Sequence, residues 1–119
     1  MGYFVKSIQA NDELFKYQCS GTDLNTLASS VDSMMIKEGY KLVSGPKANG
    51  EYEKGNRVMR ILFGAFVKYF KFSIRLKQLD DQSLELLVVK ASSGMSGGLI
   101  GMGQVKKEIR RLAQLFTTI

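Results

Sequence analysis

Alternating apolar and polar side chains predict strands in several parts of the chain. Residues 13–19 alternate, and residues 70–77 do so most regularly. A polar turn at 80–82 follows, and residues 84–91 then form a partner strand. The positions predicted to face an apolar core are Phe15, Tyr17, Cys19, Phe70, Phe72, Ile74, Leu76, Leu84, Leu86 and Val88. Strands that are apolar on one face are typical of an antiparallel sheet. In residues 84–91, Leu87 and Val89 place apolar side chains on the second face as well, which is also consistent with a strand covered on both faces.

Shorter apolar runs between these segments are interrupted by glycine and proline. One strand begins at residues 40–43. Residues 52–54 and 57–63 flank Gly55-Asn56, a dipeptide suited to a tight hairpin turn. The phase of the apolar positions changes at Gly64-Ala65, which predicts a bulge or a turn there.

Two segments repeat apolar residues at spacings of three and four, which predicts amphipathic helices. The first is capped by Thr22 or Asp23 and ends near Gly39, a residue type that often follows a helix. Its apolar stripe is Leu24, Leu27, Ala28, Val31, Met34 and Met35. The last helix carries its apolar stripe on Val105, Ile109, Leu112, Ala113 and Phe116. Lys106, Lys107, Arg110, Arg111 and Gln114 fall on the opposite face of that helix.

These elements predict an α+β fold in one globular domain over residues 1–119. We expect a single antiparallel sheet of five or six strands with two helices packed on one face. The predicted order is one strand, a helix, four or five strands and a final helix. This order resembles the TATA-binding-protein-like topology and, more loosely, the helix-grip topology of lipid- and hormone-binding proteins. The resemblance is one of element order, and no signature residues carry it.

The composition argues against most enzymatic chemistry. The chain has no histidine and one cysteine, which removes the commonest general base and the commonest transition-metal ligands. We therefore expect no enzyme, no metal and no cofactor. Cys19 lies in a predicted strand, so we interpret it as a buried packing residue. No secretory signal or membrane-length apolar run is visible, and a cytoplasmic location is predicted.

The formal charge of +6 biases the surface toward anionic partners. The residues that would contact a phosphate-bearing ligand or a nucleic acid are Lys71, Arg75, Lys77, Lys106, Lys107, Arg110 and Arg111. A solvated strand face and a solvated helix face are the plainer interpretations of the same residues. We predict a non-catalytic binding domain that favours an anionic partner; its oligomeric state stays open.

A glycine-rich stretch precedes the last helix, with Gly97, Gly98, Gly101 and Gly103 as its candidate loop residues. It lacks the lysine and hydroxyl of a Walker loop and the third glycine of a dinucleotide fingerprint. If the helix began near Gly103, Lys106 and Lys107 would lie in its first turn, where a bound anion would relieve the helix dipole. If it began near Ser96, both lysines would lie inside the helix and no anion would be needed.

A second hypothesis comes from aromatic residues that concentrate within ten positions. They are Phe63, Phe66, Tyr69, Phe70 and Phe72. Core packing explains such a cluster, but so does a pocket between the sheet and the C-terminal helix. The alternative function is therefore a carrier of an apolar small molecule.

Overall fold

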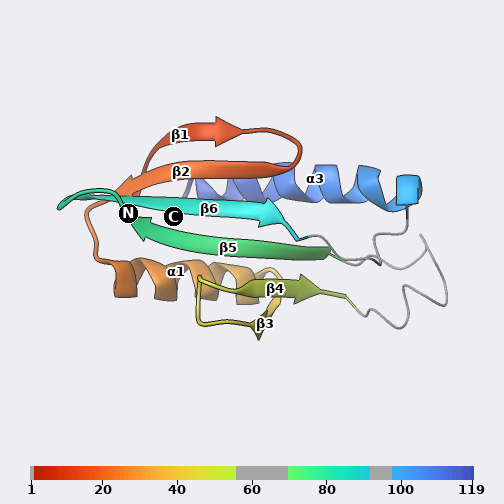
Figure 1. The fold of residues 1–119 in the computed structure, drawn as a ribbon, viewed down its shortest axis with the longest axis horizontal. Helices are drawn as coiled ribbons and strands as arrows, with labels where there is room; N and C mark the ends of the chain where they lie inside the picture. The colour runs from red at the N-terminus through yellow and green to blue at the C-terminus, as the bar shows by residue number, and fades with distance from the viewer. Residues whose placement is uncertain (1, 56–69, 92–97) are drawn as a thin grey trace.

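Six antiparallel strands and two helices make up the part of the chain that the structure describes. The computed structural model describes residues 2–55, 70–91 and 98–119 (Figure 1). The elements are β1 (Phe4–Ala10), β2 (Leu14–Ser20), α1 (Leu24–Lys37), β3 (Lys41–Ser44), β4 (Glu51–Lys54), β5 (Phe70–Gln78), β6 (Ser83–Lys90) and α3 (Gly98–Phe116). The strands are ordered β1-β2-β6-β5-β4-β3, and every neighbouring pair is antiparallel. The predicted α+β class is confirmed.

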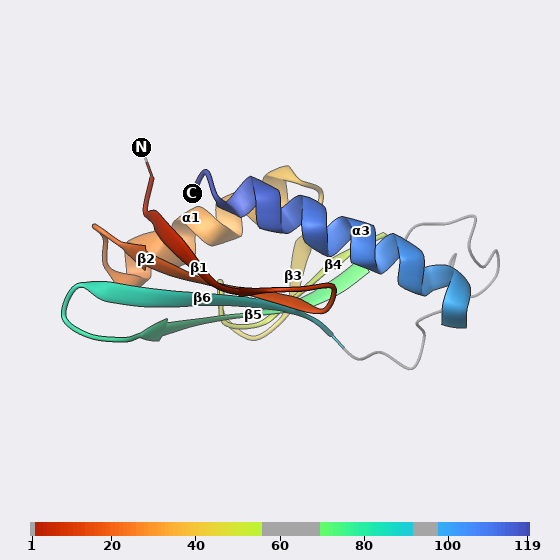
Figure 2. The ribbon, with the colours of Figure 1, turned by 90° about the horizontal axis from the view of Figure 1, so that it is seen from above.

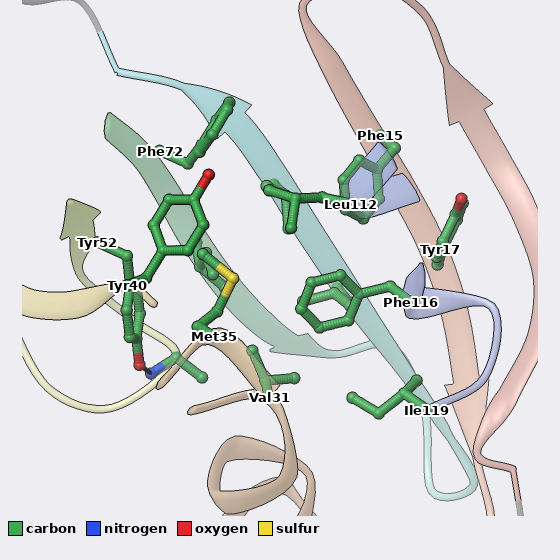
Figure 3. Packing of buried hydrophobic residues seen from close by; sticks show 14 of the residues in the cluster. Phe15, Tyr17, Val31, Met35, Tyr40, Tyr52, Phe72, Leu112, Phe116 and Ile119 are labelled. Carbon is green, nitrogen blue, oxygen red and sulfur yellow. Dashed lines mark hydrogen bonds between the residues drawn. The ribbon is translucent and has the colours of Figure 1, made fainter. Parts of the chain in front are cut away.

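Both helices lie on the same face of the sheet, as Figure 2 shows. They bury the alternate side chains of β2, β5 and β6, together with Tyr52 of β4. Phe15, Phe72 and Leu86 are fully buried, and the ring of Phe15 lies 5.8 Å from that of Phe116 on α3 (Figure 3). The period-two pattern of the sequence therefore marks the covered face correctly.

Helix α1 begins and ends where the sequence predicts. The side chain of Asp23 accepts a hydrogen bond of 2.7 Å from the backbone N–H of Thr26, which satisfies one of the free amides of the first turn. At the other end, Gly39 has φ of 95° and its N–H donates to the carbonyl of Ile36. A residue with a side chain would be strained at that φ, so glycine fits there.

Strand β1 was not predicted, and its pairing with β2 explains why. The register shifts between Phe4 and Lys6 and again between Ser7 and Gln9. Each shift inserts one extra residue, so the apolar side chains of β1 do not keep period two. The predicted Gly55-Asn56 hairpin, the strand at 57–63 and the change at Gly64-Ala65 extend into or lie within residues 56–69, outside the described residues.

The last helix starts at Gly98, so the alternative that it starts near Gly103 is wrong. Gly98, Gly101 and Gly103 belong to the helix, while Gly97 lies outside the described residues. Helix α3 therefore includes three glycines, and each costs about 1 kcal/mol relative to alanine inside a helix.

Candidate functional site

The predicted cations lie on two opposite sides of the molecule and do not form one site. Lys71, Arg75 and Lys77 alternate with the buried residues of β5, so they lie on the sheet face opposite the helices. Lys106, Lys107, Arg110 and Arg111 lie on α3, on the side of the sheet that the helices cover. The two groups therefore form separate surfaces.

Two of the four helix cations are held in contacts within the protein. The guanidinium of Arg110 donates from Nε to Oδ1 of Asp12 at 2.7 Å. Arg111 donates to Glu38 at 2.5 Å and to both carboxylate oxygens of Glu108, at 2.8 and 2.9 Å. These two arginines fasten α3 to the β1–β2 turn and to the end of α1.

Glu108 is the centre of a buried polar cluster on α3. Its side chain is almost fully buried, and Oε2 accepts a hydrogen bond of 2.5 Å from the hydroxyl of Tyr40. Burial alone would raise the pKa of Glu108, but the hydrogen bonds from Arg111 and Tyr40 outweigh it and lower that pKa. Burial and the bond to Glu108 raise the pKa of Tyr40. The cluster therefore holds a charged carboxylate inside the fold.

A second buried polar cluster joins α1 to the β3–β4 loop. The hydroxyl of Tyr52 donates to Oδ1 of Asp32 at 2.5 Å and accepts from the backbone N–H of Ala48 at 2.9 Å. Figure 3 shows the Tyr52 ring within the core. All three residues are buried. Burial, then the bond to Asp32, raises the pKa of Tyr52 to about 12, so the phenol stays protonated near neutral pH.

Sequence reasoning did not single out either cluster, although a signal was present. Glu108 lies three residues after Val105 and four before Leu112, within the apolar stripe of the last helix. Asp32 has the same kind of position between Ala28 and Met35 of α1. An acidic residue inside an apolar stripe indicates a buried carboxylate with a partner.

Lys106 and Lys107 are exposed and lie well inside α3, eight or nine residues after its start. Because α3 starts at Gly98 and not near Gly103, these lysines lie outside its first turn and no anion is needed there to relieve the helix dipole. In the described part of the chain neither lysine has a hydrogen-bonded or ion-paired protein partner.

The open sheet face, meaning the face away from the helices, carries charges whose positions follow from strand register. Residues directly opposite one another on neighbouring strands share a face. One row runs across the sheet through Lys6, Gln18, Glu85 and Lys77. The next row runs through Gln9, Lys16, Leu87 and Arg75. Both described helices lie on the opposite face of the sheet (Figure 2).

Four cations thus surround one carboxylate at this end of the open sheet face. Lys6, Arg75 and Lys77 are exposed and Lys16 is half-buried. Arg75 uses one N–H on the backbone carbonyl of Ile74 at 2.9 Å, and its remaining donors have no described protein acceptor. The sequence-based set contained the two β5 cations of this group but not Lys6 and Lys16.

Lys71, the third predicted cation of β5, belongs to a different environment. Its Nζ lies 3.6 Å from Oε1 of Glu51, and in the sheet register it lies opposite Glu53. The ion pair with Glu51 therefore separates Lys71 from the cations grouped around Glu85.

The described aromatic residues of the predicted pocket belong to the core. Phe70 is 6% exposed, Phe72 is fully buried, and their rings stack with centroids 6.5 Å apart. Phe63, Phe66 and Tyr69 lie outside the described residues. Beneath α3, Ile109, Leu112 and Phe116 are buried in the same core. The described members of the aromatic group therefore pack in the core, and the carrier hypothesis stays a prediction.

Cys19 is buried, as predicted, and burial raises the pKa of its thiol to about 11. Among the described residues, no three Cys, Asp or Glu side chains gather as they would around a metal ion. Neither described helix is long and apolar enough to cross a membrane.

Comparisons with protein families, curated proteins and solved structures give no match for this chain.

Proposed function

We propose that this protein is a non-catalytic binding domain whose open sheet face takes a nucleic acid or another phosphate-bearing partner. The observation that carries the proposal is the grouping of Lys6, Lys16, Arg75 and Lys77 on two adjacent rows of that face. Within these two rows, Glu85 is the one acidic residue among those that the structure describes. Cations without internal partners bind phosphates at little cost, because no ion pair has to be broken first.

The helix side supports such binding less well. Arg110 and Arg111 already bond to Asp12, Glu38 and Glu108, so a phosphate would have to displace a carboxylate. Lys106 and Lys107 have no such partner among the described residues, so they serve as matched control cations for those on the sheet. The buried free thiol of the chain's single cysteine fits a reducing compartment such as the cytoplasm.

The test compares how nucleic-acid affinity changes when two cations are removed from the open sheet face and when two are removed from α3. Fluorescence anisotropy with a labelled random-sequence nucleic acid gives affinity as a function of salt. The Lys16→Gln/Arg75→Gln variant removes two sheet cations, and Lys106→Gln/Lys107→Gln removes two helix cations. The proposal predicts that the sheet variant lowers the slope of log K against log salt by about 2 while the helix variant leaves it nearly unchanged. Equal effects of both variants, or no salt-sensitive binding by the native protein, would contradict it.

A further inference from the structure

The four sheet cations form two pairs, or columns, one on each side of β6, and β6 itself presents no positive charge to this face. Lys6 and Lys16 lie on β1 and β2, and Arg75 and Lys77 lie on β5. Between them runs β6, which presents Glu85 and Leu87 to the same face. Glu85 repels phosphate and Leu87 offers no charge, so a single phosphate chain cannot follow one continuous positive track across this surface.

The separation of the two columns follows from the spacing of strands. Lys16 and Arg75 lie two strands apart, so their backbones are separated by about 10 Å at ~4.8 Å between neighbouring strands. Lys6 and Lys77 lie three strands apart, about 14 Å. The major groove of a B-form duplex is about 12 Å wide, which falls between these two values. Each column can therefore meet one of the two phosphate backbones that border a groove.

The described aromatic residues argue against a single strand as the ligand. Proteins that bind single strands stack the bases on exposed aromatic rings. In the described sheet, the rings of Phe15, Tyr17, Tyr52, Phe70 and Phe72 point to the covered face and are buried. The half-buried ring of Phe4 packs edge-on against Tyr17. Contacts to phosphates alone require no such ring and carry no sequence information.

We infer that the partner of the open sheet face is duplex DNA, bound across a groove through both backbones and without sequence preference. This inference rests on the proposed function, since it names the ligand class of the same surface. Glu85 and Leu87 then lie over the groove, away from both phosphate chains.

The experiment uses a short random-sequence duplex, one of its strands alone and two variants of the intact protein. Lys6→Gln/Lys16→Gln neutralises one column, and Arg75→Gln/Lys77→Gln neutralises the other. Circular dichroism checks that both variants fold. We expect tighter binding of the duplex than of the single strand at equal salt. We also expect each variant to lower the salt slope for the duplex by about 2.

Different results would contradict the duplex inference and the proposed function. If the protein binds both nucleic acids with a salt-dependent affinity but holds the single strand as tightly as the duplex, the inference is wrong and the proposed function stands. The inference is also wrong if only one of the two columns affects duplex binding. If neither nucleic acid binds with salt sensitivity, the proposed function itself fails.

Discussion

Removal of the Tyr52 hydroxyl tests whether the buried cluster on α1 and the β3–β4 loop stabilises the fold. The Tyr52→Phe substitution keeps the ring in the core but takes away one donor and one acceptor. The Asp32 carboxylate loses a bond of 2.5 Å, and the amide of Ala48 loses one of 2.9 Å. Both groups stay buried, so water cannot replace the lost partner.

The expected cost follows from these two losses. A buried amide left without an acceptor costs about 1–3 kcal/mol, and a lost bond to a charged group about 1.5–3 kcal/mol. We therefore expect Tyr52→Phe to lower the free energy of unfolding by about 2.5–6 kcal/mol. A domain of this size has about 5–15 kcal/mol in total, so the loss is a large fraction of its stability.

Urea unfolding followed by circular dichroism measures the effect, with Tyr17→Phe as the matched control. The hydroxyl of Tyr17 makes one hydrogen bond, to the carbonyl of Ala113 at 2.6 Å, so its removal should cost about 1 kcal/mol. Asp32→Asn keeps an acceptor for Tyr52 and should cost less than Tyr52→Phe. The reasoning is refuted if Tyr52→Phe destabilises the protein no more than Tyr17→Phe does.

Three further predictions concern other parts of the fold. Because the pKa of Glu108 is lowered in the folded protein, its ion pair with Arg111 stabilises the fold above the ordinary carboxyl pKa and is lost as the pH falls. Glu108→Gln should therefore destabilise the protein more at pH 7 than at pH 3 in urea titrations; an equal effect at both values would contradict this. A Cβ on Gly50 would lie 1.9 Å from the carbonyl oxygen of Ser44, so Gly50→Ala should lower the free energy of unfolding by about 1–3 kcal/mol, and an unchanged value in the same titration would show the contact to be harmless. The Cys19 thiol is buried and its pKa is about 11, so a thiol reagent should label it only after denaturant is added; rapid labelling of the native protein would refute this.

The covered side of the sheet was predictable because its chemistry repeats with the period of a strand. Phe70, Phe72 and Ile74 alternate with polar residues and are buried, as the sequence indicates. Helix α1 was predictable because its apolar stripe, its cap at Asp23 and its stop at Gly39 all agree. Local propensity and tertiary packing act together in these segments.

The basic surface was only half predictable, because it depends on pairing between distant strands. Arg75 and Lys77 could be placed on one strand face from their own spacing. Lys16 joins them through β6, and Lys6 through a strand whose two register shifts hide its pattern. Sequence periodicity reports on one strand at a time and gives no information about which strands are neighbours.

The partners of the helix cations were also beyond the sequence pattern. Arg110 and Arg111 lie on the polar face of α3, and the helical period predicts only that they are exposed. Their bonds to Asp12 and Glu38 join residues more than seventy positions apart in the chain. These contacts depend on how α3 is placed over the sheet.

Chemical-shift mapping of the amides, during titration of the ¹⁵N-labelled protein with a duplex DNA, tests the central claim most directly. Binding at the open sheet face predicts that the largest shifts occur at Lys6, Lys16, Arg75 and Lys77, and that they diminish as salt is added. The amides of Lys106 and Lys107 on α3 should change little. Shifts that concentrate on α3, or the absence of salt-dependent shifts on β1, β2 and β5, would contradict the account.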